Sequence, residues 1–437
     1  MQAVIENRTS ALIADRDDRA LDRRIAVALF IIATVIATLF VQIRGEFEKL
    51  GEEPRVGIHV SLGHGFRTPL DLSPDAEISA WMPPIYPIVS GTAFRLFGGP
   101  GPLAFRLLME INAICYGLMV AGTFVMARLL LSRPAGVLAA VFVICHPMFL
   151  MLVHRFWHTY LAQAGMIWLI VAALRTQRSG PTFLRLALIG AGLGILVQMN
   201  GSFILVAPII VWLAVRDLPI ARWFPFMAAS AITFILMLVP WTVRNYVQFH
   251  QLTYVRRGAE LEMWLGNLPG SNGWQDLRFH PTVYLPEHQK MLEMGEANYF
   301  AYCKERFLEN YHRAPMEYWK RCARRALYLV IGEPNSRPME WKHASAWFGQ
   351  LRLIMDVLIF SLGTAGLIAA WRLGYRTAWV VPFSIASTVP YLISHMNYRF
   401  SMHIKLLLLM MIAFLIWSIW QRRVMGAWPR RDVVVNA

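Results

Sequence analysis

An all-α protein that crosses a membrane about ten times is predicted by the composition of this chain and by the spacing of its apolar runs. Hydrophobic residues make up 57% of its 437 residues and charged residues 16%, and its mean hydropathy is +0.44. Soluble domains average about 45–50% apolar and about 25% charged residues. This composition excludes a disordered chain, a coiled coil and most soluble enzymes. It also argues against a nucleic-acid partner as the reason for the net charge of +15.

The first predicted span covers residues 25–41 and follows a charged segment that ends at Arg23 and Arg24. A cleaved signal peptide would have a similar charged head and apolar run. However, the small-residue cleavage pattern is missing, and many more apolar runs follow. We therefore expect an uncleaved first span.

A polar stretch, 44–102, comes next, and we call it the first outer loop. It contains one short apolar segment, 84–97, which is too short to cross the bilayer comfortably. A run rich in glycine and proline ends this segment at 98–102. We expect 84–97 to form a helix that lies in the membrane interface.

Nine further spans follow, six before and three after a long polar region at 244–350, which we call the outer region. Their approximate limits are 103–131, 136–153, 161–174, 184–198, 203–215, 223–243, 351–371, 378–393 and 401–420. The outer region itself is expected to be mostly helical, with helices at 287–313 and 316–331 separated by Pro315. The chain thus divides into a cytoplasmic segment (1–24), a transmembrane module (25–243), the outer region (244–350), C-terminal spans (351–420) and a basic cytoplasmic tail (421–437).

Arginine positions predict the orientation, because Lys and Arg concentrate in the cytoplasmic connections of membrane proteins. With the N-terminus inside, the inner connections and the tail carry thirteen arginines against Asp217 and Asp432, a net of +11 of the total +15. Both termini are then inside, and the first outer loop and the outer region face outward. Arg155 and Arg399 are exceptions, because they lie in two short connections on the outer side. We therefore expect a local role for them.

Chemistry is expected at the outer surface of the membrane. No GxxxxGK[ST], HExxH or GxSxG motif occurs in the chain, so direct use of ATP or a nucleotide sugar is not expected. The first outer loop contains four glutamates that a catalytic role could use: Glu46, Glu48, Glu52 and Glu53. A carboxylate beside the membrane suits a general base that activates an acceptor hydroxyl. A solvated acidic face is the alternative, and composition does not choose among the four.

Several motifs of the first outer loop carry a family resemblance. Glu52 and Arg55 precede Gly-His-Gly-Phe at 63–66, Trp-Met-Pro-Pro-Ile-Tyr-Pro at 81–87 and Phe-Arg-Leu-Phe-Gly at 94–98. This order resembles the first outer loop of bacterial membrane glycosyltransferases of the GT-C superfamily. More narrowly, it resembles glycosyltransferase family 39, the branch of the dolichyl-phosphate-mannose protein mannosyltransferases, which is related to the aminoarabinose transferases. Glu52 stands at the acidic position of that family.

The likeness continues along most of the chain. Trp-His-Thr-Tyr-Leu at 157–161 is similar to the second outer loop of the family, and 240–246 is similar to the end of its seventh span. Residues 257–267 and the late loop 394–399 also fall in the family's order. Together these segments extend over about residues 20–420.

The resemblance implies a GT-C fold, with juxtamembrane helices in the first outer loop, in a bacterial inner-membrane enzyme. Such enzymes move a sugar, with inversion, from a polyprenyl phosphate carrier to an acceptor hydroxyl at the outer face. The implied partners are this lipid-linked donor, membrane lipids, and a glycan, lipid or protein acceptor. The resemblance implies Glu52 as the general base, with Glu53 as the alternative. It implies a set of substrate-binding residues: Arg55, Arg155, His158, Arg257, Glu260, Asn267 and Arg399.

Within that set, Arg257 and Arg399 are expected to bind the carrier phosphate, with Arg244 and Arg256 as further candidates. Glu260 and Asn267 either shape the sugar pocket or cap local structure. His158 stands where relatives have an acid, so it can hydrogen-bond but supplies no negative charge. No metal ligand is therefore predicted, although a divalent cation stays open.

Two other classes of protein fit the same composition. One is a transporter or flippase for lipid-linked saccharides, and the other is a relative that binds such lipids without catalysis. Transporters often contain repeated halves and polar sites near the middle of the membrane. This chain shows no internal repeat, and its polar clusters fall in the outer loops, which favours the enzyme.

Overall fold

Every regular element among the described residues is a helix, as the sequence predicts. The computed structural model describes residues 2–44, 50–274, 279–332 and 346–429. Within these ranges, extended backbone pairs only as two isolated bridges, Arg67 with Ile78 and Trp274 with Met396.

Six of the described helices are long and apolar enough, by length and composition, to cross a membrane. They are α1 (Gln2–Arg44), α4 (Pro102–Leu130), α7 (Thr159–Ser179), α10 (Trp223–Phe249), α15 (Ala346–Arg372) and α17 (Met402–Met425). This confirms the prediction of a helical protein that passes through the membrane several times.

The other four predicted spans correspond to shorter apolar helices. They are α5 (Arg133–Cys145), α8 (Phe183–Val197), η1 (Gly201–Leu205) followed by α9 (Ala207–Val215), and α16 (Val380–Ile393). The span expected at 136–153 is interrupted, because Pro147 has no amide hydrogen to continue α5 and instead begins the short α6 (Pro147–Met151). The total of ten spans stays a prediction.

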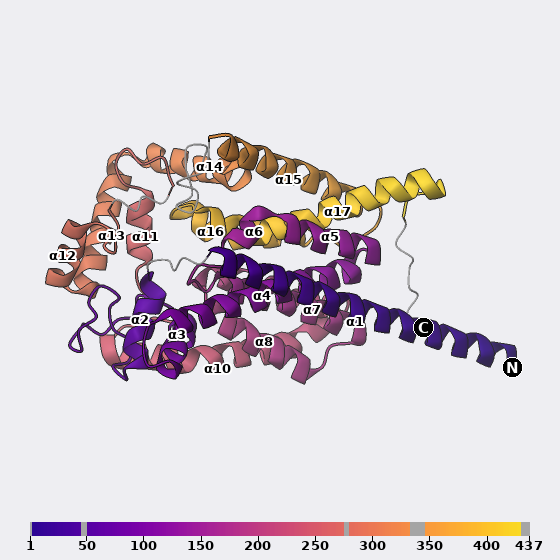
Figure 1. Ribbon diagram of the computed structural model, residues 1–437, viewed down its shortest axis with the longest axis horizontal. Helices are drawn as coiled ribbons and strands as arrows, with labels where there is room; N and C mark the ends of the chain where they lie inside the picture. The colour runs from indigo at the N-terminus through magenta and orange to yellow at the C-terminus, as the bar shows by residue number, and fades with distance from the viewer. Residues whose placement is uncertain (1, 45–49, 275–278, 333–345, 430–437) are drawn as a thin grey trace.

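The two ends of the helix bundle differ in what they carry (Figure 1). The N-terminal end of α1 and the C-terminal end of α17 extend from one end of the bundle. At the opposite end lie the short helices α2 (Glu52–Ser61), α3 (Ile85–Leu96), α11 (Ala259–Gly266), α12 (Leu285–Met294) and α13 (Glu296–Arg313). We call the end that carries α2, α3 and α11 the outer end, following the predicted orientation.

At the end of the bundle opposite the outer end, arginines of the predicted inner connections pair with acidic side chains. Asp22 of α1 lies 2.9 Å from Arg128 and 2.5 Å from Arg133, which belong to α4 and α5. Asp217 lies 2.5 Å from Arg376. These pairs join the ends of helices that are far apart in the sequence, so the arginines fix helix packing as well as signalling orientation.

The short apolar segment 84–97 forms α3, whose twelve residues are too few to cross a bilayer. α3 packs closely on α2 because both helices place a glycine at the crossing. A Cβ on Gly57 would lie 2.2 Å from Ser90 Oγ, and a Cβ on Gly91 would lie 2.8 Å from the Gly57 oxygen. This close contact fixes the direction in which α2 presents its first turn.

The outer region is helical in its described part, with one difference from the prediction. The single helix expected at 287–313 is two helices, α12 and α13, because Gly295 adopts a φ of 76°. Glycine reaches this left-handed region without steric cost, and the chain turns there. The second expected helix is present as α14 (Pro315–Ile331), with proline in its first turn.

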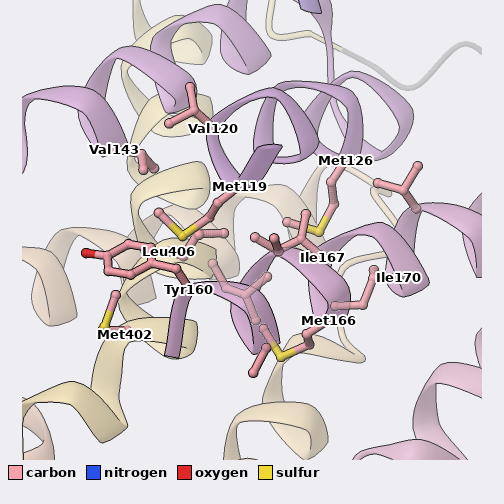
Figure 2. Packing of buried hydrophobic residues seen from close by; sticks show 14 of the residues in the cluster. Met119, Val120, Met126, Val143, Tyr160, Met166, Ile167, Ile170, Met402 and Leu406 are labelled. Carbon is pink, nitrogen blue, oxygen red and sulfur yellow. The ribbon is translucent and has the colours of Figure 1, made fainter. Parts of the chain in front are cut away.

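The main core lies where α4, α7 and α17 meet (Figure 2). Met119 and Met126 of α4, Met166 and Ile167 of α7, and Leu406 of α17 are all fully buried or nearly so. A second cluster joins the first outer loop to the outer region, with Trp81, Leu261 and Phe300 among its buried members. These two cores hold the outer-end segments against the bundle.

One buried ion pair crosses between two of the apolar helices and predicts a stability effect. Lys405 Nζ lies 2.7 Å from Asp356 Oδ1, and each side chain is only 3% exposed. Removal of one partner from a buried pair destabilises a protein by about 3–5 kcal/mol, whereas replacement of both by apolar residues is often neutral. We expect Lys405→Met and Asp356→Leu each to lower the thermal midpoint of the purified protein. The double variant should recover most of that loss, and an additive loss in the double variant would contradict the pairing.

Candidate active site

Glu53 and His158 form a close polar contact at the outer end. Glu53 lies in the first turn of α2, and His158 immediately precedes α7. His158 Nδ1 is 2.5 Å from Glu53 Oε1, and the His158 backbone amide donates to Oε2 at 3.2 Å. Glu53 is 6% exposed, so both of its carboxylate oxygens are committed within a buried environment.

The charge of Glu53 is stabilised despite this burial. Burial alone would raise its pKa, but His158 and, more weakly, Arg399 oppose this effect and hold the pKa below its ordinary value. Glu53 is therefore an anion in the resting protein.

Trp157 brings the two unusual outer arginines together. The guanidinium of Arg399 lies 4.4 Å from the centre of the Trp157 ring, and that of Arg155 lies 5.2 Å from it. Such cation–π contacts hold a guanidinium in place without neutralising it. Arg399 is half-buried, and its Nε atom has no hydrogen-bond partner among the described residues. The site thus combines a buried carboxylate with a positioned cation.

A second acid–base group lies close by, and the sequence singled out only its Arg256, as a further phosphate-binding candidate. Arg256 donates to Glu262 Oε1 at 2.7 Å, and His395 Nδ1 lies 3.3 Å from Glu262 Oε2. Burial would raise the pKa of Glu262, but His395, Arg256 and His280 lower it to about 2. Burial lowers the pKa of His395 to about 4, so this ring is neutral near pH 7. Glu262 lies inside the motif 257–267, but nothing in the spacing distinguished it from Glu260.

Glu52, the expected base, points to a different partner set from Glu53. Its Oε1 accepts a hydrogen bond from Thr282 Oγ1 at 3.3 Å and lies 3.7 Å from His280 Nε2. Arg55 donates to the Leu70 carbonyl at 3.3 Å. Glu52 therefore binds the first outer loop to the outer region, whereas the Arg55 bond lies within the first outer loop. The other two glutamates considered, Glu46 and Glu48, lie outside the described residues.

Of the remaining expected binding residues, Asn267 is held by local structure. It is 1% exposed, donates to the Met263 carbonyl at 2.7 Å and accepts from Arg325 at 2.7 Å. The geometry thus favours the capping role over the sugar-binding role. Glu260 is half-buried in the first turn of α11.

The other basic candidates contact the first outer loop. The Arg257 backbone amide donates to Ala80, and its guanidinium lies 5.1 Å from the Phe249 ring. Arg244 donates to the carbonyls of Ser79 and Phe66 at 2.8 and 3.1 Å. Two carbonyl bonds give Arg244 a role in holding this loop on the end of α10.

A small cavity opens beside the Glu53–His158 pair and extends between the apolar helices. Its lining includes His158, Gln163, Asn200, Tyr391, Arg399 and His403. The arrangement therefore places the Glu53–His158 pair and the Arg399 cation beside one polar cavity. Within the described ranges, no group of three or more His, Cys, Asp or Glu side chains is placed to hold a metal ion.

A multi-pass helical bundle whose outer loops fold over one end in this way has the fold of the GT-C glycosyltransferases. Among solved structures, the chain is similar to the oligosaccharyltransferase of Archaeoglobus fulgidus crystallised with zinc and sulfate. The TM-score is 0.55 at 15% identity, over 91% of this chain and 50% of that chain. The same oligosaccharyltransferase, AglB, in complex with an inhibitory peptide and a dolichol-phosphate gives a TM-score of 0.53 at 15% identity, over 93% and 52% of the two chains.

A weaker likeness joins the chain to ArnT from Cupriavidus metallidurans bound to undecaprenyl phosphate. Its TM-score is 0.44 at 14% identity, over 92% of this chain and 79% of that chain. This chain spans about half the length of the oligosaccharyltransferase. No protein-family model matches the chain, and no curated protein matches it. The likeness to the oligosaccharyltransferase shows the fold, and the narrower family 39 branch stays a prediction.

Proposed function

We propose that the protein transfers a sugar from a polyprenyl phosphate carrier to an acceptor hydroxyl at the outer face of the membrane. The observation that carries this proposal is the buried Glu53–His158 pair beside Arg399, at the outer end of a bundle with the GT-C fold. A carboxylate-supported histidine suits removal of a hydroxyl proton, and a guanidinium suits a phosphate leaving group. The oligosaccharyltransferase that shares the fold is itself known in complex with a dolichol-phosphate.

The proposed step begins with the acceptor oxygen attacking the anomeric carbon of the donor sugar. The new carbon–oxygen bond forms as the bond from that carbon to the phosphate oxygen breaks on the opposite face, which inverts the configuration. Because Nδ1 of His158 donates to Glu53, Nε2 is the nitrogen that accepts the hydroxyl proton. Glu53 orients the ring and stabilises the imidazolium that forms, as a carboxylate does behind other catalytic histidines. Arg399 then faces the charge that develops on the departing polyprenyl phosphate.

Glu53 fits this role better than Glu52, which the family position favours. The two residues are adjacent in α2, so their side chains leave the helix about 100° apart. Glu53 faces His158 and feels the charge of Arg399, whereas Glu52 faces Thr282 and His280. The proposal therefore moves the essential carboxylate from Glu52 to Glu53, with His158 as the base that receives the proton and Glu53 as the residue that positions it.

Comparison of glycolipids and envelope glycans tests the reaction class directly. In a strain that lacks the protein, mass analysis should find one sugar missing from an acceptor, while the corresponding polyprenyl phosphate sugar accumulates. Complementation with the wild-type chain should restore the sugar, and complementation with Glu53→Gln should not. A missing acceptor sugar with the donor retained on the inner side of the membrane would instead support a flippase.

A further inference from the structure

The cavity beside His158 contains buried polar atoms that nothing in the described protein satisfies. Gln163 is 4% exposed and His403 is 2% exposed. Gln163 Oε1 and His403 Nε2 have no hydrogen-bond partner among the described residues. Unpaired polar atoms in a buried site destabilise the protein, so their presence in the cavity lining points to a ligand with hydrogen-bonding groups.

Other lining residues belong to a polar network that is already satisfied within the protein. Tyr391 Oη lies 2.6 Å from Ser202 Oγ, and Asn200 donates to the same Tyr391 oxygen at 3.1 Å. The Tyr391 ring stacks on Phe400 with their centres 3.8 Å apart. The lining of the cavity thus combines unpaired hydrogen-bonding atoms with two stacked aromatic residues, Tyr391 and Phe400. A sugar ring matches this arrangement, because its hydroxyls lie around the rim and its C–H bonds cover its faces.

The charges that line the cavity indicate whether a bound sugar would be charged or neutral. No carboxylate lines the cavity, and Arg399 is its one guanidinium among the described lining residues. Glu53 reaches the cavity only through His158, which occupies its Oε1 and Oε2 atoms. An ammonium group on the sugar would therefore meet no free anion. A sugar carboxylate would compete with the carrier phosphate for Arg399.

We propose that this cavity receives the sugar ring of the donor and that the sugar is uncharged, with Gln163 and His403 binding its hydroxyls. The inference rests on the proposed function, because it assumes a polyprenyl phosphate donor. It adds the substrate class and two specificity-determining residues that lie on α7 and α17, outside every motif of the outer loops.

Binding measured on the full chain in lipid nanodiscs tests this inference. The probes are bare polyprenyl phosphate, polyprenol, and polyprenyl phosphates that carry glucose, mannose, arabinose, an amino sugar or a uronic acid. At least one neutral sugar should improve affinity over bare polyprenyl phosphate by about ten-fold, which is about 1.4 kcal/mol. Gln163→Leu and His403→Phe should each remove the affinity gained from the sugar. Each variant should bind bare polyprenyl phosphate with an affinity within about two-fold of wild type. Gln177→Leu is the matched control. Gln177 also lies on α7, but near its C-terminal end, where it donates to Asp217 away from the cavity.

The outcomes separate this inference from the proposed function. If polyprenyl phosphate binds no better than polyprenol, the proposed function and the inference both fail. If polyprenyl phosphate binds but no neutral sugar adds affinity, or if the amino sugar or uronic acid adds most, only the inference fails. If Gln163→Leu and His403→Phe keep the full gain, the sugar lies elsewhere and the cavity assignment is wrong.

Discussion

Glutamine in place of Glu53 is expected to reduce sugar transfer by about 10²–10⁴-fold, the range typical for loss of a general base. The substitution keeps the size of the side chain but removes the negative charge that His158 contacts at 2.5 Å. An amide cannot stabilise the imidazolium, and it can turn its NH₂ group towards Nδ1 and reverse the tautomer, so that Nε2 carries the proton. Both effects deprive the acceptor hydroxyl of its base.

The measurement is acceptor-dependent release of polyprenyl phosphate by the purified variant, with its thermal midpoint and its binding of bare carrier as controls for folding. Glu52→Gln is the informative comparison, because the two glutamates are neighbours in α2 and contact different partners. Its transfer rate should stay within about ten-fold of wild type, since its partners are Thr282 and His280. The reverse ranking, with Glu52→Gln inactive and Glu53→Gln active, would return the base to the family position.

Most of the fold could be predicted because membrane spans are encoded locally. A run of apolar residues between charged ends is visible in any window of the sequence, and the six long helices follow directly from such runs. The shorter helices were harder to delimit, because proline breaks such as Pro147 shorten a helix inside an apolar run. The split at Gly295 was missed for a related reason: one glycine in a helical pattern is often tolerated, and only its positive φ shows a turn.

The site was less predictable because its members come together through tertiary packing. The choice between Glu52 and Glu53 depends on how α2 is rotated, which the contact of Gly57 with Gly91 helps to fix. His395 meets Glu262 from a distant loop, and no local pattern links the two. Asn267 looked like a pocket residue in its motif, but its buried bond to Arg325 gives it a structural role. Sequence patterns therefore located the segments of the site but could not assign directions to neighbouring side chains.

Replacement of Arg399 by glutamine is the second large effect that we expect, with a loss of about 10²–10³-fold in kcat/KM. Its guanidinium is held over Trp157 at 4.4 Å, and its charge acts on Glu53, so it lies in the same site as the proposed base. The leaving phosphate gains negative charge as its bond to the sugar breaks, and a positioned cation stabilises that charge. Arg399→Lys should give an intermediate loss, because lysine keeps the charge but loses the planar fork that binds two phosphate oxygens. Steady-state kinetics and the affinity for bare polyprenyl phosphate measure both variants.

Arg257→Gln provides the comparison that decides between the two phosphate-binding candidates. Its guanidinium lies over Phe249, and its backbone binds Ala80, so its side chain belongs to the junction of α10 with the first outer loop. We expect Arg257→Gln to reduce kcat/KM by less than about ten-fold. If Arg257→Gln instead abolishes transfer and weakens carrier binding while Arg399→Gln does neither, the phosphate lies near Arg257. Glu53 and His158 would then lose the role proposed for them, because that role requires the leaving phosphate to lie at Arg399.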